Sequence, residues 1–147
     1  MIIKAYEHEK IKKTNNKIFL FYGENNGFKN QVVQKVFFEK FKGNIERYEE
    51  NEILNNYDNF ISGLTNKSFF EELKLILISR VTEKITKLID EVLDREINDV
   101  NIVLNADVLE KKSKLRAIFE KDKNLICVPF YKDDNRTLIG LASNFFK

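Results

Sequence analysis

The residues best suited to chemistry form a short glycine-bounded loop near the N-terminus. Residues 23–30 read GENNGFKN and directly follow an apolar, β-prone run at 18–22. A glycine-rich turn between a buried strand and a helix is the setting of a nucleotide-binding loop. There, backbone amides, a lysine and a Ser/Thr hydroxyl hold phosphate and magnesium. This loop is therefore the first candidate for a ligand site.

The loop departs from the phosphate-binding pattern in length, charge and hydroxyl content. It is shorter than G-x-x-x-x-G-K-[ST], and Phe28 separates Gly27 from Lys29. Asn30 replaces the hydroxyl residue, and Glu24 places a negative charge where phosphate would lie. We therefore expect a degenerate phosphate loop that holds no nucleotide and no other cofactor. The residues that keep its frame are Gly23, Gly27 and Lys29.

Other residues with catalytic or metal-binding chemistry are few. Asp107 is the only acid near the ends of the two predicted strands at 73–78 and 101–104, and its isolation favours a helix-capping role over a metal ligand. His8 is the only histidine, in an N-terminal segment that we expect at the surface. Cys127 is the only cysteine, which excludes an internal disulfide, and its apolar neighbours indicate an inert core thiol. We expect neither a metal site nor an enzyme.

Alternating strand and helix patterns must position the loop. Apolar β-prone runs predict strands, and apolar residues at helical spacing predict helices between them. The predicted strands are 18–22, 44–48 (with a weak apolar signal), 73–78, 101–104 and 125–128; the predicted helices lie at 28–41, 57–64, 85–93 and 115–119. This alternation predicts an α/β domain, with a mainly parallel five-stranded sheet and helices on both faces. Ligands of such sheets bind at the carboxyl ends of the strands, where the loop lies.

Composition narrows the class of protein further. The chain has 147 residues and a formal net charge of +2, the size of one domain without a strongly basic footprint for nucleic acid. Its start lacks the apolar core of a signal peptide, and the run at 75–78 is too short to cross a bilayer. We expect a cytoplasmic protein without membrane contact. One predicted helix carries a basic group, which favours a solvated face over a DNA contact: Lys111, Lys112, Lys114 and Arg116.

A second candidate site is an aromatic pair that precedes the strand at 73–78. Ser68 and Glu71 have capping-box spacing, so a short helical turn is expected here. Phe69 and Phe70 are adjacent on that turn and point in different directions. The pair either packs between the preceding helix and the strand or protrudes into a partner's pocket. Periodicity alone favours packing within the domain.

Several blocks of the sequence resemble one known family in their order and spacing. The blocks are FYGE at 21–24, SFF at 68–70, NIVL at 101–104, LEKKSKLR at 109–116 and FEK at 119–121. Together they resemble the N-terminal domain of the delta subunit of the bacterial DNA polymerase III clamp loader, across nearly the whole chain. The resemblance implies an AAA+-like (P-loop NTPase-like) first domain that has lost nucleotide binding, in agreement with the degenerate loop.

The resemblance also implies a partner and a site. In this family a Ser-Leu-Phe element inserts its two apolar side chains into a hydrophobic pocket of the sliding clamp and helps open the ring during DNA replication. The corresponding residues here are Ser68, Phe69 and Phe70, with Phe69 at the leucine position. With this likeness added, we favour insertion of the aromatic pair into a partner's pocket over packing within the domain. The clamp-binding residues that we expect are Thr65, Lys67, Ser68, Phe69 and Phe70.

Family members continue into a second small domain and a helical collar that joins the other loader subunits. We therefore expect residues 1–135 to form the AAA+-like clamp-binding domain and residues 136–147 to begin the connection to the next domain. Two alternatives remain open from the residues alone: an unorthodox P-loop ATPase, and a structural scaffold for other replication subunits.

Overall fold

A computed structural model describes residues 1–14, 16–39, 41, 43–65, 74–95 and 100–130. Its strands are β1 (Ile18–Tyr22), β2 (Asn44–Glu49), β3 (Lys74–Ser79), β4 (Val100–Asn105) and β5 (Leu125–Pro129). Its α-helices are α1 (Asn26–Val33), α2 (Glu50–Asn55), α3 (Tyr57–Thr65), α4 (Thr86–Asp94) and α5 (Lys114–Lys121). Shorter helical segments are η1 (Ala5–Lys13), η2 (Gln34–Phe38) and η3 (Glu83–Ile85).

The strands form one parallel sheet in the order β2-β3-β4-β1-β5. The predicted five-stranded parallel α/β architecture is therefore confirmed. β1 lies between β4 and β5, and its five residues are all buried. β2 is an edge strand, with Ile45 38% exposed, which explains why its apolar signal in the sequence is weak.

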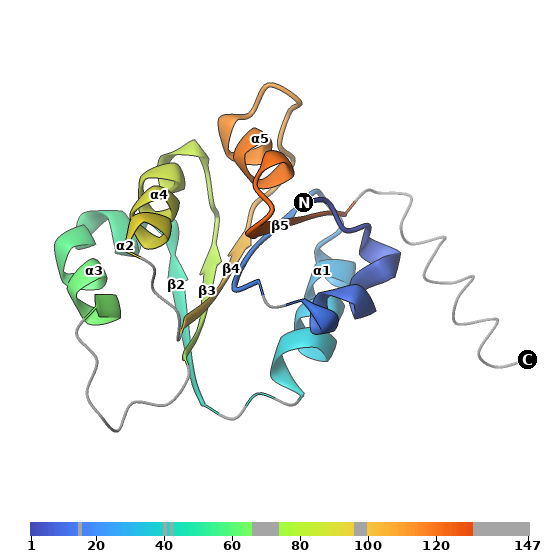
Figure 1. Cartoon of the computed structure of the whole chain (residues 1–147), viewed down its shortest axis with the longest axis horizontal. Helices are drawn as coiled ribbons and strands as arrows, with labels where there is room; N and C mark the ends of the chain where they lie inside the picture. The colour runs from blue at the N-terminus through green and yellow to red at the C-terminus, as the bar shows by residue number, and fades with distance from the viewer. Residues whose placement is uncertain (15, 40, 42, 66–73, 96–99, 131–147) are drawn as a thin grey trace, which may run out of the picture.

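Two hydrophobic cores cover the two faces of the sheet. The first packs α2 to α5 against one face, and the second packs η1, α1 and η2 against the other (Figure 1). β1 contributes to both because its side chains alternate: Ile18, Leu20 and Tyr22 enter the first core, and Phe19 and Phe21 enter the second. Cys127 is completely buried in the first core, as predicted.

The helices differ from the prediction in three places. The single helix expected at 28–41 is α1 followed by one π-helical turn, η2, in which Phe37 packs on Phe19 with 4.9 Å between ring centroids. The helix expected at 57–64 is preceded by α2, whose capping box is formed by Glu49 and Glu52. The 3₁₀ segment η1 was not predicted because its apolar residues do not recur at α-helical spacing.

Within the described part of the chain, no helix is both long enough and apolar enough to cross a membrane. The expected connection at 136–147 lies outside the described residues.

Candidate functional site

The loop after β1 lies against the backbone that leaves β5. Gly23 has a φ of +119°, and a Cβ built on it would lie 1.9 Å from the carbonyl oxygen of Phe130. Gly23 is thus required by close packing within the domain. Gly27 has no such requirement, since the nearest atom to its Cβ position is Asn25 Oδ1 at 4.0 Å.

Backbone hydrogen bonds hold the loop to both neighbouring strands. The amide of Gly23 donates to the carbonyl of Asp107 at 3.1 Å, beyond the end of β4. The amide of Phe130 donates to the carbonyl of Tyr22 at 2.7 Å, beyond the end of β5. An amide that would bind phosphate in a nucleotide loop is therefore engaged inside the protein.

Asn25 closes the start of α1. Its Oδ1 accepts a hydrogen bond from the amide of Phe28 at 3.1 Å, and its carbonyl accepts one from the amide of Lys29 at 3.0 Å. An N-cap side chain satisfies amides that a helix start would otherwise offer to an anion. The cap therefore reduces the capacity of this helix start to bind phosphate.

Lys29 points into the protein. Its side chain is 1% exposed, and Nζ donates to Asn105 Oδ1 at 2.9 Å and to the carbonyl of Ala106 at 3.0 Å. Burial lowers the pKa of Lys29 from its usual value of 10.5, and the charge of Asp107 partly offsets this effect. The lysine of the phosphate-loop frame thus links α1 to the end of β4.

Asn105 is the site residue that the sequence interpretation missed. It directly follows the strand predicted at 101–104, so its position at the carboxyl edge was visible, but its pairing with Lys29 was not. Asp107 is exposed and does not cap a helix, because α5 begins at Lys114 and is capped by Ser113; the capping prediction was wrong. No cluster of three potential metal ligands occurs among the described residues.

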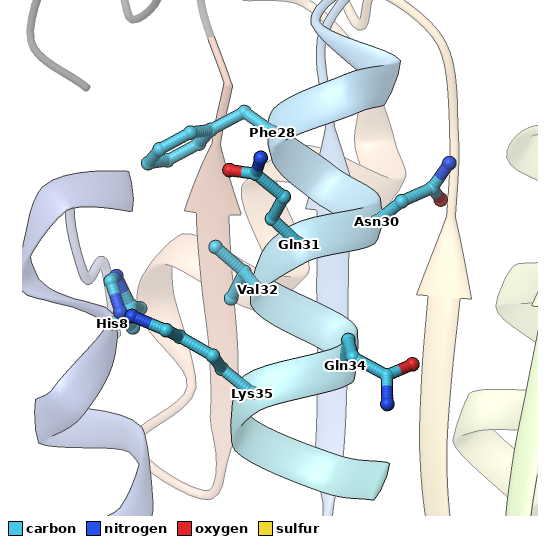
Figure 2. Close-up of a pocket in the computed structure, with 7 residues that line it drawn as sticks. All are labelled: His8, Phe28, Asn30, Gln31, Val32, Gln34 and Lys35. Atoms are coloured by element: carbon cyan, nitrogen blue, oxygen red, sulfur yellow. The ribbon is translucent and has the colours of Figure 1, made fainter. Parts of the chain in front are cut away.

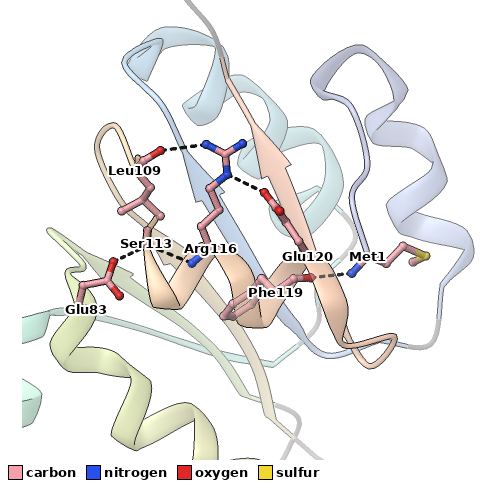
Figure 3. A network of polar contacts seen from close by, with 7 residues as sticks. All are labelled: Met1, Glu83, Leu109, Ser113, Arg116, Phe119 and Glu120. Carbon is pink, nitrogen blue, oxygen red and sulfur yellow. Dashed lines mark hydrogen bonds and ion pairs between the residues drawn. The ribbon is translucent and has the colours of Figure 1, made fainter. Parts of the chain in front are cut away.

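The N-terminus of α5 is tied to the segment that follows β3 (Figure 3). The Ser113 hydroxyl donates to the carboxylate of Glu83 and accepts from the amide of Arg116 at 3.1 Å. Glu83 Oε2 also accepts from the amide of Leu115 at 2.8 Å. A carboxylate at a helix N-terminus is stabilised by the helix dipole.

The prediction that four basic residues share one helix is wrong, because Lys111 and Lys112 precede α5 and only Lys114 and Arg116 lie on it. Arg116 is engaged internally, with Nε 2.6 Å from Glu120 Oε1 and an Nη1 hydrogen bond of 3.1 Å to the carbonyl of Leu109 (Figure 3). Lys111, Lys112 and Lys114 are exposed. A face for nucleic acid would therefore have three of the four basic residues predicted for it.

The other end of α5 receives the N-terminus of the chain. The Met1 ammonium donates to the carbonyls of Phe119 at 2.6 Å, Asp122 at 3.0 Å and Leu125 at 2.8 Å (Figure 3 shows the first). Residues 1–3 also pair with Cys127 on the outer side of β5. The first residue thus supports both α5 and the edge of the sheet.

The predicted clamp-binding residues Lys67, Ser68, Phe69 and Phe70 lie outside the described residues. Thr65 is the last residue of α3, and β3 begins at Lys74. The start of β3 is at the amino edge of the parallel sheet, whereas the loop at Gly23 is at the carboxyl edge. The start of β3 and the loop at Gly23 therefore lie at opposite edges of the sheet.

Comparison with solved structures shows what this fold is similar to. No protein-family model matches the chain, and no curated protein matches it. Among solved structures, it is similar to the Bacillus subtilis DNA clamp loader delta protein (YqeN), with a TM-score of 0.61 and 14% sequence identity. The match covers 86% of this chain and 42% of that protein. This shows a clamp-loader-like fold, in a chain that spans less than half the length of its structural neighbour.

Proposed function

We propose that this chain is the clamp-binding domain of a clamp-loader subunit of the delta type, which binds a sliding clamp and helps open the ring without hydrolysing nucleotide. The fold shared with a clamp loader delta protein supports the class of protein. In this proposal residues 1–135 are the clamp-binding domain and residues 136–147 begin the connection to further domains, through which other loader subunits are contacted.

The observation that carries the absence of catalysis is the burial of Lys29. Its ammonium donates to Asn105 and Ala106 inside the domain, and the amide of Gly23 donates to Asp107. Both groups would have to leave these partners before they could bind phosphate. Leaving a buried polar group without its hydrogen-bond partner costs about 1–3 kcal/mol. The carboxyl edge of the sheet is therefore a structural element here, and we propose that it binds no nucleotide.

We assign the clamp contact to the opposite edge, at Thr65, Lys67, Ser68, Phe69 and Phe70. The two phenylalanines would enter an apolar pocket of the clamp. Burial of one Phe contributes roughly 1.5–3 kcal/mol, so the pair contributes about 3–6 kcal/mol before the costs of association. DNA contact through the exposed Lys111, Lys112 and Lys114 would be weak, since the net charge of the chain is only +2.

Surface plasmon resonance on the sliding clamp of the source organism tests the proposal. We expect saturable binding by the unmodified chain, and binding about a hundredfold weaker or absent for Phe69→Ala/Phe70→Ala. Circular dichroism of the double variant checks that the domain is folded. No binding by the folded, unmodified chain would contradict the clamp assignment and favour a structural scaffold.

Calorimetric titration with Mg-ATP separates the proposal from an unorthodox ATPase. We expect no saturable heat with the unmodified chain, because Lys29 is engaged internally. Tight binding of Mg-ATP that is lost on replacement of Lys29 would contradict the non-catalytic assignment, whatever the outcome with the clamp.

A further inference from the structure

A polar cavity lies at the amino edge of the sheet, on the face that η1 and η2 cover. Its volume of about 470 Å³ is in the range of small-molecule sites. Two lysines and three other polar residues line it, and none of its described lining residues is acidic: Lys12, Lys17, Thr14, Asn16 and Asn101. Its floor includes Phe19 and Phe37, which are buried and offer little apolar area. Recognition in this cavity would therefore rest on its polar groups.

Lys17 brings an ammonium without a protein partner to this cavity. The residue directly precedes β1, and its carbonyl accepts a hydrogen bond of 2.8 Å from the amide of Ile102, which holds its backbone beside β4. Its side chain is half-buried, and the ammonium forms no hydrogen bond or ion pair with any residue that the structure describes. A half-buried charge has lost part of its hydration. An anion in the cavity would replace the interactions that are lost.

Asn101 is a polar residue in a row of core positions. It is in register with Leu75 on β3, and because side chains alternate along a strand it shares a face of β4 with Val103. Leu75 and Val103 are both buried in the second core. The side-chain amide of Asn101 has no hydrogen bond to a described residue, and no fully buried polar side-chain atom in the described part of the chain lacks a partner. The amide is therefore open to the cavity and available to a ligand.

The helical wall of the cavity contains the π-helical turn η2. Val36 and Phe37 of this turn line the cavity, and π-helical turns are frequent at functional sites. Phe37 packs on Phe19 of β1, which fixes the turn against the sheet. The cavity is thus formed by packed elements in the absence of a ligand.

We propose that this cavity binds a small phosphate-bearing molecule, whose phosphate oxygens accept hydrogen bonds from the Lys17 ammonium and the Asn101 amide. Lysine is a common phosphate ligand, and an amide donor adds direction to its point charge. Lys12 contributes less, because it is paired with Glu9 at 3.4 Å. The enclosed volume and the net charge of only +2 favour a small molecule over a nucleic acid. This inference does not rest on clamp binding.

Isothermal titration calorimetry of the full chain with metal-free pyrophosphate tests the site. We expect saturable binding that becomes about tenfold weaker or more in Lys17→Met, which removes the ammonium and keeps most of the apolar stem. The matched control is Lys35→Met. Figure 2 shows Lys35 pointing toward His8 in a separate cavity, between η1 and α1, so this control removes the same charge from elsewhere. We expect it to change the affinity by less than about twofold.

Two results of these titrations would overturn the proposal. One is the absence of saturable pyrophosphate binding by the folded, unmodified chain. The other is equal weakening by Lys17→Met and Lys35→Met, which would report net charge rather than a site. A single-stranded oligonucleotide is titrated in parallel. Binding of the oligonucleotide that depends on Lys17, without binding of pyrophosphate, would also overturn the proposal, because the phosphate would then belong to a nucleic acid.

A substitution at Asn101 separates ligand binding from folding. We expect Asn101→Val to weaken pyrophosphate binding several-fold without lowering the free energy of unfolding, because valine suits a core-facing position in a strand. Urea unfolding of this variant measures its stability. Unchanged pyrophosphate binding would overturn the role of the amide.

Amide chemical shifts in NMR spectra locate the bound anion. We expect pyrophosphate to shift the amides of Lys17, Val36 and Asn101. Shifts confined to residues 23–30 would overturn this site and would instead contradict the internal role of Lys29. Binding of any phosphate compound that is lost on replacement of Lys17 belongs to this cavity, and binding lost on replacement of Lys29 belongs to the loop after β1. The two proposals therefore fail separately.

Discussion

At Gly23 the chain turns out of β1 in contact with the Phe130 backbone. Two conditions require glycine at this position: its φ is +119°, and the Phe130 carbonyl oxygen would lie 1.9 Å from a Cβ atom. The sequence interpretation chose Gly23 for its place in a phosphate-loop pattern. In the structure Gly23 lets β1 pack closely against the end of β5.

We therefore expect Gly23→Ala to destabilise the domain by about 3 kcal/mol or more, because strain at positive φ adds to displacement of the Phe130 backbone. Urea unfolding followed by circular dichroism measures the change in the free energy of unfolding. Gly63→Ala is the matched control. Gly63 lies in α3 with nothing within 4 Å of its Cβ position, and alanine there should stabilise by about 0.5–1 kcal/mol. Equal effects at the two positions would contradict the packing role.

Lys29 shows what residue patterns predict and what they do not. The spacing of Gly27 and Lys29 placed the lysine correctly at the start of a helix after β1. Its inward direction depends on Asn105 and Ala106, which are 76 and 77 residues away in sequence. A contact between such distant residues is set by strand order, which local patterns do not contain.

Among the elements, α5 is held at both ends by groups from elsewhere in the chain. Glu83 and Ser113 satisfy its N-terminus, and the Met1 ammonium satisfies carbonyls at its C-terminus. A negative group at the first end and a positive group at the second both complement the helix dipole. This short helix therefore depends on tertiary partners for its stability.

Removal of the α5 cap should be measurable. We expect Ser113→Ala to lower the free energy of unfolding by about 1 kcal/mol, since it removes the N-cap acceptor and one partner of Glu83. Glu110→Ala is the control. Its carboxylate is exposed and pairs with Lys112 at 3.5 Å, so its loss should change stability by less than about 0.5 kcal/mol. Urea unfolding of both variants checks the difference, and an equal loss would contradict a capping role.

Strands were easier to predict than helices in this chain. β1 was predicted at 18–22 and found there because it is buried on both faces and reads as a continuous apolar run. The helix predicted at 28–41 changes to a π-helical turn at Gln34. In that turn Phe37 packs on Phe19 and Phe21, and helical periodicity does not report this packing.

At the scale of the whole molecule, the parallel sheet has two different edges. At its carboxyl edge, Gly23 packs against Phe130 and Lys29 bonds to Asn105. Its amino edge includes the start of β3, which follows the predicted aromatic pair in sequence. The fold class followed from alternating patterns, whereas the order β2-β3-β4-β1-β5 did not. Whether the aromatic pair binds a clamp stays a prediction.

The stability of the whole domain should depend on pH through Lys29. Its pKa is lowered in the folded protein, so between that value and 10.5 the unfolded chain binds more protons, and stability rises with pH. Cys127 acts in the opposite direction, because burial raises its pKa from 9.0 to about 11. The difference in unfolding free energy between the unmodified chain and Lys29→Met isolates the lysine.

We expect this difference to increase in favour of the unmodified chain as the pH is raised from 7 to 10. Urea unfolding at intervals across that range measures it. Cys127 and the tyrosines are present in both proteins, so their contributions cancel. A difference that stays constant with pH would show that Lys29 titrates normally in the folded state.

The internal hydrogen bonds of Gly23 and Lys29 also decide what it would take to turn this loop into a nucleotide site. A chain carrying Phe28→Gly or Asn30→Ser would still have the Gly23 amide bonded to Asp107 and the Lys29 ammonium bonded to Asn105. Phosphate binding by Gly23 and Lys29 would then still require these internal bonds to break before any phosphate contact offset the loss. Restoring the loop pattern alone would therefore not create a nucleotide site in this domain, because the internal partners of Gly23 and Lys29 would have to be replaced as well.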